Sequence, residues 1–389
     1  MSQGSDIKLI GVNDHQVDLF EGQFPVPDGM AYNSYFIEDE KLTVIDTVDA
    51  HFGEEWLGNV SAAADGRAID YLIVQHMEPD HSANVVRFLA AYPQATVVAS
   101  APAFRMMKAY FGDEYAARRI VVKDGDTLST GRHQLHFVTA PMVHWPEVIF
   151  TYDATAKALF SADAFGKFGA LDTTDPDDWD CEARRYYFGI VGKFGPQVCA
   201  ALAKTTKLPI EAIYPLHGPA HTTPEKIAHV LQQYTTWSNY AVETKGVVIA
   251  YTSVYGHTRE VVLKLKDFLE KKGCDRVVVA DLARDEMFET IEDAFRHDRL
   301  VLATTTYNND IFPPMRHFIE HLVARNFQKR RVGLIENGSW APQAAKVMKA
   351  LLVPCKDLVF IDPIVTVNAA LTAQSEAQLT ALADALIQA

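Results

Sequence analysis

The sequence predicts an α/β protein of two domains, with layered sheets in residues 1–244 and a doubly wound parallel sheet in residues 245–389. Its 389 residues are enough for two or three domains of ordinary size. In the first part several strand-like runs precede each helical stretch, which favours stacked sheets over a regular βαβ series. After Thr244 strands and helices alternate regularly, and this pattern is typical of a doubly wound sheet.

The strands expected in the first part are short apolar runs, several of them followed by polar residues. They lie at 41–46, 71–75, 95–99, 134–139, 158–161 and 212–216. Helices are expected at 82–91 and 196–206. Because such strand ends can converge on one edge of a layered domain, the polar residues after them are candidates for a shared site.

The second part contains five expected strands, each followed by an expected helix. The strands lie at 246–251, 276–282, 300–304, 331–335 and 358–365. The helices lie at 257–272, 287–297, 314–324, 342–352 and 373–387. In a doubly wound sheet ligands bind at the carboxyl ends of the strands, so the loops at these ends predict the position of a second site.

Composition excludes several classes of protein. The net charge of -14 disfavours a nucleic-acid partner. No run of about 18 apolar residues predicts a membrane span, and the N-terminus has neither the basic nor the apolar segment of a secretory signal, so we expect a cytoplasmic protein with no membrane partner. None of the four cysteines forms a Cys-x-x-Cys pair, which argues against a zinc ribbon, a rubredoxin-type iron site or a redox dithiol.

The strongest local signal is a run of four metal-capable side chains within six residues, directly after an expected strand. They are His76, Glu78, Asp80 and His81. We expect a loop to present them, and since one ion cannot accept all four with good geometry, two neighbouring ions are more natural. Three more candidate ligands stand shortly after strands, namely His144, Asp163 and His217.

The pattern His-x-Glu-x-Asp-His, with a later His, Asp and His, resembles the flavodiiron protein family, a branch of the metallo-β-lactamase superfamily. The segments Tyr-Asn-Ser-Tyr at 32–35, His-Trp-Pro-Glu at 144–147 and Asp-Ala-Phe-Gly at 163–166 also resemble this family, and the likeness covers essentially the whole chain. It implies a metallo-β-lactamase-like αββα sandwich with two iron ions in residues 1–244 and a flavodoxin-like FMN-binding domain in residues 245–389. The resemblance assigns His76, Glu78 and His144 to one iron, Asp80, His81 and His217 to the other, and Asp163 as a bridge.

Glu78 distinguishes this pattern from the zinc hydrolases of the superfamily, which carry a histidine at that position. Carboxylates are hard anionic ligands that favour iron or manganese over zinc. With three carboxylates and four neutral imidazoles, a di-ferrous pair would keep roughly one net positive charge (+4 − 3), so the site could change oxidation state without a large build-up of charge. His81 could be a ligand or could swing away and leave water on its iron.

Three loops at expected strand ends form a candidate flavin site. The hydroxyl- and glycine-rich loop at 252–258 joins a strand to a helix, as phosphate-binding loops do, and it lacks the lysine of a nucleotide P-loop. It resembles the flavodoxin phosphate loop, which implies FMN rather than FAD. The other two loops bring Tyr307 and Trp340, either of which could cover the isoalloxazine ring. The candidate contacts are Thr252, Ser253, Val254, Tyr255, Gly256, His257, Thr258, Thr306, Tyr307, Asn308, Asn309, Asp310, Asn337, Gly338, Ser339 and Trp340.

The resemblance implies an oxidoreductase in which FMN passes electrons to the di-iron site, where O2 is reduced to water or NO to N2O. It further implies a head-to-tail homodimer or a dimer of dimers. Because the chain ends soon after the second domain, we expect an external electron donor such as rubredoxin or a reduced deazaflavin. Two alternatives remain open: a zinc-dependent hydrolase fused to a flavodoxin-like domain, and an electron carrier in which only the second domain works.

Overall fold

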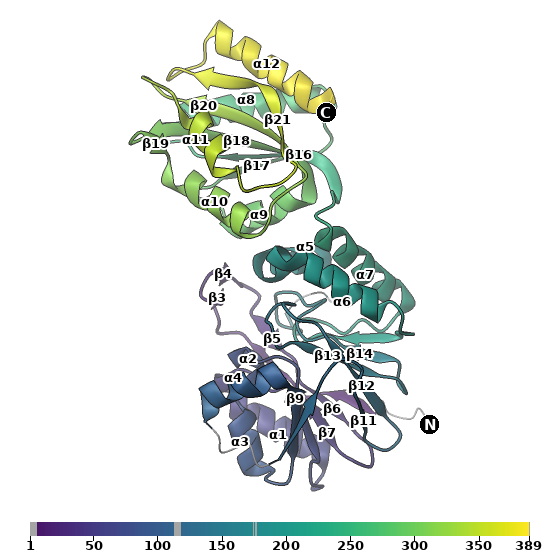
Figure 1. Cartoon of the computed structure of the whole chain (residues 1–389). Helices are drawn as coiled ribbons and strands as arrows, with labels where there is room; N and C mark the ends of the chain where they lie inside the picture. Colours follow the sequence, from purple (N-terminus) through teal and green to yellow (C-terminus); the bar gives the residue numbers. More distant parts are fainter. Residues whose placement is uncertain (1–5, 113–117, 174, 176, 389) are drawn as a thin grey trace. The chain divides into compact units, whose positions relative to one another are not determined.

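The computed structural model describes residues 6–112, 118–173, 175 and 177–388. The chain divides into two compact units, Met1–Ser238 and Asn239–Ala389 (Figure 1). In the second unit, the Arg330 guanidinium donates hydrogen bonds to the carbonyl groups of Tyr240 (2.8 Å) and Ala241 (3.1 Å), which lie shortly before the boundary predicted after Thr244. Within the described residues, none of the helices has both the length and the apolar composition that crossing a bilayer requires.

The first unit contains two sheets. Across the first sheet the order is β1 (Ile7–Leu9), β6 (Tyr35–Ile37), β7 (Thr43–Ile45), β8 (Tyr71–Val74), β9 (Thr96–Ser100) and β10 (Arg119–Val122). Across the second it is β11 (Thr127–Ser129), β12 (Gln134–Thr139), β13 (Ile149–Asp153), β14 (Ala158–Phe160) and β15 (Ala212–Tyr214). Two short ribbons pair β2 (Val12–Asp14) with β5 (Met30–Tyr32), and β3 (Leu19–Phe20) with β4 (Phe24–Pro25).

Helices cover both sheets of this unit. They are α1 (Gly53–Ala64), α2 (Pro79–Ser82), α3 (Val85–Ala91), α4 (Ala101–Phe111), α5 (Asp180–Tyr186), α6 (Gly195–Thr205) and α7 (Pro224–Ser238). Helix α4 contacts β9 of the first sheet, and α6 contacts β12 of the second. Between the sheets, Ile73 and Val98 pack with Phe137 and Phe160 in one apolar core. This arrangement confirms the predicted layered sheets.

The helix predicted at 82–91 is wrong at its start, since the helical path breaks at Asn84. The Asn84 side-chain amide donates hydrogen bonds to the carbonyl groups of Val48 (2.7 Å) and Asp49 (3.0 Å), which lie outside the helix. The separate helix α2 begins at Pro79, whose fixed φ suits a first helical position. The prediction that a loop presents the candidate ligands is therefore also wrong for the second half of the segment, because Asp80 and His81 lie in this helical turn and are buried.

The second unit is one parallel sheet with helices on both faces. Its order is β17 (Val277–Asp281), β16 (Thr244–Tyr251), β18 (His297–Tyr307), β20 (Arg331–Asn337) and β21 (Val359–Val367). In chain order this is 2-1-3-4-5, the order of flavodoxin, so the predicted fold class is confirmed. The short β19 (Asp310–Ile311) pairs antiparallel with the end of β18. Strand β18 extends beyond the predicted 300–304 at both ends.

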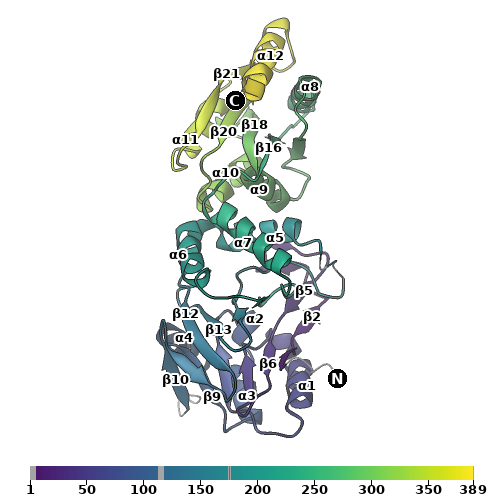
Figure 2. The ribbon, with the colours of Figure 1, turned by 90° about the vertical axis from the view of Figure 1, so that its right-hand side faces the viewer.

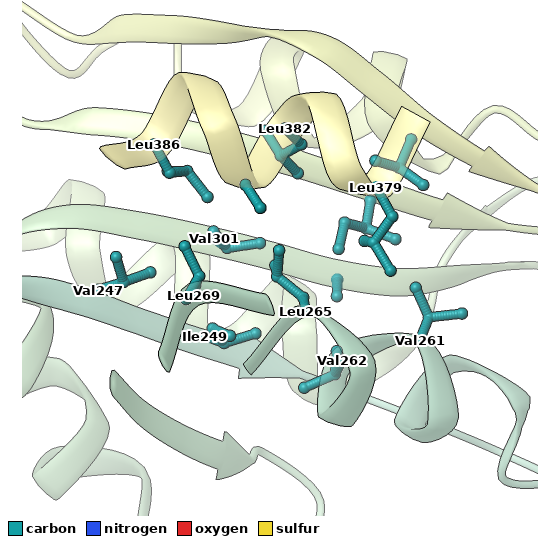
Figure 3. Close-up of a cluster of buried hydrophobic side chains, with 14 of the residues drawn as sticks. Val247, Ile249, Val261, Val262, Leu265, Leu269, Val301, Leu379, Leu382 and Leu386 are labelled. Carbon is teal, nitrogen blue, oxygen red and sulfur yellow. The ribbon is translucent and has the colours of Figure 1, made fainter. Parts of the chain in front are cut away.

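The helices of this unit are α8 (His257–Lys271), α9 (Met287–Arg296), α10 (Pro313–Ala324), α11 (Ala344–Leu351) and α12 (Ala373–Gln388). Figure 2 shows α8 and α11 on opposite sides of the sheet. In the apolar core under α8 and α12, Leu265 and Leu382 face Val247, Ile249 and Val301 of the sheet (Figure 3). These helices and this core hold the strand ends in place, so the loops that follow the strands start from fixed positions.

His133 forms a buried ion pair in the first unit. Its Nδ1 lies 2.5 Å from an Asp153 carboxylate oxygen, and its backbone N–H donates to the carboxylate of Asp39, which follows strand β6 (2.9 Å). The hydrogen bond to Asp153 raises the pKa of His133 against the opposing effect of burial, with further contributions from the charges of Asp39 and Asp6. A raised pKa means that the ion pair contributes its full stability below the unfolded pKa of about 6.5 and loses it as the pH rises through the folded value.

We therefore expect His133→Gln to lower the free energy of unfolding by about 1.5–3 kcal/mol near pH 6, and by less near pH 9. Denaturant unfolding, followed by tryptophan fluorescence, measures this free energy. The signal reports mainly on the first unit, because four of the five tryptophans lie there. His136→Gln, a histidine on the adjacent strand β12, is the control and should show no such pH dependence. An equal loss at both pH values would contradict the prediction.

Candidate functional site

The first group of candidate metal ligands converges after β8, β12 and β14. The donor atoms of His76, Glu78, His144 and Asp163 all lie within 4.8 Å of one another. His76 Nε2 is 3.2 Å from Glu78 Oε2 and 3.3 Å from His144 Nε2, and His144 Nε2 is 3.1 Å from Asp163 Oδ2. Donors that surround one metal at about 2.1 Å are separated by roughly 3.0–3.4 Å, so this group fits a transition-metal ion.

The second group has the same dimensions and lies next to the first. His81 Nε2 is 3.0 Å from His217 Nε2 and 3.3 Å from Asp80 Oδ2, and His217 Nε2 is 3.4 Å from Asp80 Oδ2. Asp80 and His81 are neighbours in helix α2, and His217 follows β15. The structure therefore brings all seven predicted ligands together, in two groups.

Asp163 lies between the two groups. Its Oδ2 is 3.1 Å from His144 Nε2 in one group, and its Oδ1 is 3.2 Å from His81 Nε2 in the other. Both of its carboxylate oxygens are buried, and among the described residues the nitrogens nearest to them belong to these histidine ligands. Both oxygens of Asp80 are likewise buried and have no hydrogen-bond partner in the described part of the chain. Because a buried carboxylate is costly without a donor or a cation beside it, these four oxygens fit the role of metal ligands.

The outer nitrogens of the histidines have partners that the sequence prediction did not assign. Glu147 Oε1 lies 2.8 Å from His76 Nδ1, and the Ala31 carbonyl oxygen lies 2.7 Å from His217 Nδ1. The Asp46 carboxylate accepts hydrogen bonds from the backbone of Gln75 (2.7 Å) and thereby orients the start of the ligand segment. The only signal for Glu147 was its place in the His-Trp-Pro-Glu segment, and Ala31 acts through its backbone, which its residue type does not reveal.

Burial and neighbouring charges shift the pKa values of the candidate ligands. Burial lowers the pKa of His144, but the hydrogen bonds that its ring donates to the Asp163 and Glu78 carboxylates outweigh this effect and raise that pKa to about 9. Burial raises the pKa of Asp80 to about 7, with the charges of Glu78 and Asp163 adding to it. A metal ion must displace the proton on His144, so metal uptake releases protons and weakens as the pH falls.

A cavity of about 480 Å³ opens onto these groups and is bordered by both acidic and apolar side chains. Its lining includes Asp14, Leu19, Phe20, Glu21, Tyr32, Asp49, Phe52, Glu78 and Asp80. The His217 ring is enclosed by aromatic rings, with centroid distances of 5.5 Å to Phe20, 6.0 Å to Tyr32 and 5.5 Å to Tyr186. Burial, followed by the charge of Glu78, raises the pKa of Glu21 to about 7.

The second site lies at the carboxyl ends of β16, β18 and β20. Its cavity is lined by Ser253, Val254, Tyr255, His257, Thr258, Thr305, Asn337, Gly338, Ser339 and Ala369. Helix α8 begins there after Gly256, whose φ of +98° suits glycine. The Ser253 hydroxyl oxygen accepts hydrogen bonds from the backbone N–H groups of Gly256 (3.1 Å) and Arg259 (3.3 Å). The positive end of the helix dipole and the Thr258 hydroxyl favour an anion at this place, which fits a phosphate group. Thr305 and Ala369 are lining residues that the sequence prediction missed.

Three predicted flavin contacts are large exposed aromatic side chains, of which Tyr255 lines this cavity. The exposed fraction is 91% for Tyr255, 81% for Trp340 and 43% for Tyr307. Exposure on this scale is unusual for aromatic rings, and it leaves their faces free to cover a planar ring system. These side chains and the phosphate-type loop together fit FMN.

The other predicted flavin contacts have different surroundings. Tyr307, Asn308 and Asp310 border a separate cavity, where Asp310 forms an ion pair with Arg316 (2.5 Å). Asn309 lies in the turn between β18 and β19 with a positive φ of 59°. The two remaining hydroxyl groups have protein partners: Thr252 Oγ1 bonds Thr304 Oγ1 (2.6 Å), and Thr306 Oγ1 accepts from the Gln343 backbone (3.0 Å).

Comparisons with known proteins agree with the fold of the chain. Residues 30–218 match the family model described as ODP family beta lactamase. A nitric oxide reductase of Moorella thermoacetica is 29% identical over 93% of this chain and 92% of its own length, and an anaerobic nitric oxide reductase flavorubredoxin of Salmonella arizonae is 28% identical over 87% of this chain and 72% of its own.

Two solved structures match nearly the whole chain. Rubredoxin oxygen:oxidoreductase from the anaerobe Desulfovibrio gigas superimposes with a TM-score of 0.91, at 26% identity, covering 98% of this chain and 96% of that one. The flavodiiron protein from Giardia intestinalis gives a TM-score of 0.90, also at 26% identity, covering 98% of this chain and 95% of that one.

Proposed function

Because this chain belongs to the flavodiiron protein family, we propose that it is an oxidoreductase that reduces O2 to water, NO to N2O, or both, at a di-iron site supplied with electrons by FMN. One observation carries the proposal: seven buried or partly buried donor side chains form two adjacent groups that share Asp163. The relatives named as nitric oxide reductase and as rubredoxin oxygen:oxidoreductase support the two substrates.

In this proposal His76, Glu78 and His144 hold one iron, Asp80, His81 and His217 hold the other, and Asp163 bridges them. The irons supply positions for a small substrate and electrons to reduce it. The chain itself fixes where the substrate can enter. Phe20, Tyr32 and Tyr186 surround the His217 ring. The cavity beside Glu78 and Asp80, which Phe20 and Tyr32 also line, would be the route of entry.

In the second unit, the loop from Ser253 to Thr258 and the N-terminus of α8 would hold the FMN phosphate. The flavin supplies electrons one at a time when bound. Asn337 fixes the geometry of this cradle, because its side-chain amide donates to Thr258 Oγ1 (3.3 Å) and to the Ala369 carbonyl oxygen (3.1 Å). Tyr255 and Trp340 are free to shield the ring from water.

Family resemblance supports further proposals about assembly. We propose a head-to-tail homodimer or a dimer of such dimers, in which the flavin of one subunit serves the irons of the other. The donor would be an external carrier, either rubredoxin or a reduced deazaflavin, and the protein would act in the cytoplasm. Loss of activity on dilution to the monomer would support the dimer, and a fully active monomer would contradict it.

The test of the proposed function is the metal and flavin content of anaerobically purified protein, together with its consumption of O2 and NO. We expect about two irons and one FMN per chain, and turnover of at least one of the two gases. Zinc with little iron, in protein from an iron-replete culture, would contradict the proposal and favour hydrolysis at the same groups.

Thr258→Ala tests the flavin loop. Thr258 is buried at the start of α8 and lines the cavity, so its hydroxyl can donate to a phosphate. Because hydrogen bonds to charged groups contribute about 1.5–3 kcal/mol, we expect FMN binding to weaken by roughly 10- to 100-fold while the iron content stays unchanged. Fluorescence titration with FMN measures the binding affinity.

The matched control is Thr380→Ala, an exposed threonine of α12 whose hydroxyl bonds only a carbonyl group of its own helix in the described structure. Its FMN affinity should equal that of the wild type. Unchanged affinity in Thr258→Ala would remove this residue from the phosphate site.

A further inference from the structure

We infer that Glu147 makes the two irons unequal, so that the iron held by His76, Glu78 and His144 has the lower reduction potential and is oxidised first. Glu147 does not touch substrate or metal and acts through His76, as a positioning residue. The inference rests on the proposed di-iron function and adds an assignment of which iron carries the ferric charge.

The contact between Glu147 and His76 is short and completely buried. Glu147 Oε1 lies 2.8 Å from His76 Nδ1 and accepts a second hydrogen bond from the Met77 backbone N–H (2.8 Å). The side chains of His76 and Glu147 are both 0% exposed. Since the carboxylate can only accept here, Nδ1 of His76 carries the proton, and Nε2 directs its lone pair at the first ligand group.

The second group has no equivalent anion. The outer nitrogen of His217 faces the neutral carbonyl oxygen of Ala31 (2.7 Å), and the outer nitrogen of His81 is buried without a hydrogen-bond partner among the described residues. The seven ligands are otherwise similar in type, with two histidines and one carboxylate on each side of Asp163. The charge on Glu147 is therefore a clear difference between the two halves.

A carboxylate that accepts the outer N–H of a metal-bound histidine makes that histidine a stronger donor. In a buried setting the negative charge of Glu147 is weakly screened, and its second oxygen, Oε2, has no hydrogen-bond donor. Both effects stabilise the ferric over the ferrous state of the iron bound to His76. When one electron leaves the di-ferrous pair, it should therefore leave from this iron.

The experiment compares wild type with Glu147→Gln, which keeps the shape and an oxygen acceptor but removes the charge. Iron and FMN content are measured first, and the two one-electron iron potentials are then followed by electron paramagnetic resonance during a titration with ferricyanide, which accepts the electron. We expect the wild type to show two resolved steps. In the variant, the potential of the first step should rise by about 59 mV, which corresponds to a roughly 10-fold change in the equilibrium constant for the first oxidation.

Asp14→Asn is the control, because it removes a carboxylate charge near the same cavity without a contact to a histidine ligand in the described structure. Any shift there should move both steps together. A wild type with two irons but a single unresolved step would overturn the inference even if the variant failed to fold, and so would an unshifted first step in Glu147→Gln. A wild type that binds no iron would instead overturn the proposed function.

Discussion

Asp163→Ala should lose most of its iron from both positions while it keeps FMN. Asp163 directs Oδ2 toward the group of His144 and Oδ1 toward the group of His81, and the charged neighbours of both oxygens in the described structure are the histidines of these two groups. Its loss removes one ligand from each ion and leaves imidazole and carboxylate groups crowded together without the shared anion. We expect each affinity to fall by at least 10- to 100-fold, the loss typical of a perturbed metal site.

The measurement is iron and FMN analysis of the anaerobically purified variant, with O2 and NO consumption on the same sample. Retained FMN shows that the second unit is intact, so iron loss cannot be ascribed to general unfolding. Asp298→Asn, a carboxylate of the second unit bonded to the Gly246 backbone, is the control and should keep its iron. Full iron occupancy in Asp163→Ala would refute the bridging role.

Glu78→His should convert the site toward zinc. The change produces the histidine-rich pattern of superfamily zinc hydrolases at a position where the carboxylate now lies 2.9 Å from His144 Nε2. Replacing a hard anionic oxygen by a softer nitrogen lowers the preference for iron. We expect the ratio of zinc to iron in protein grown with both metals to rise on the order of 10-fold.

Activity separates the possible outcomes of this substitution. Consumption of O2 and NO should fall along with the iron content, while FMN stays bound. Glu78→Asp keeps a carboxylate and is the matched control, with iron still preferred over zinc. If Glu78→His kept iron and full activity, then Glu78 would not determine the choice of metal.

The fold could be predicted because its signals are periodic and local. Regular alternation after Thr244 predicted the parallel sheet, and the apolar runs before His76 and Asp163 predicted two of the strands that end at the metal groups. The break at Asn84 could not be predicted, since it depends on carbonyl groups of Val48 and Asp49 that are distant in sequence. The hydrogen bond between Tyr240 and Arg330 could not be predicted either, because Arg330 stands 90 residues later.

The candidate site likewise has residues that could be predicted from the sequence and residues that could not. The seven donor side chains were visible as residue types after strands, and the structure brings them together. Ala31 was not visible, because its contribution is a backbone carbonyl group, and Glu147 had no feature that tied it to His76. In the flavin loops, side chains near each other in sequence separate in space, so Thr305 lines one cavity while Tyr307 borders another.

The carboxylates that line the metal cavity have a consequence for what can enter. Asp14 and Asp49 line the cavity and repel small anions such as azide, whereas neutral diatomic gases feel no such force. Salt screens this repulsion over a Debye length of about 8 Å at physiological ionic strength, so inhibition by azide should strengthen with added salt while the rate of gas consumption stays constant. The charge of the cavity lining would then limit which small molecules reach the metals, before metal coordination distinguishes among them.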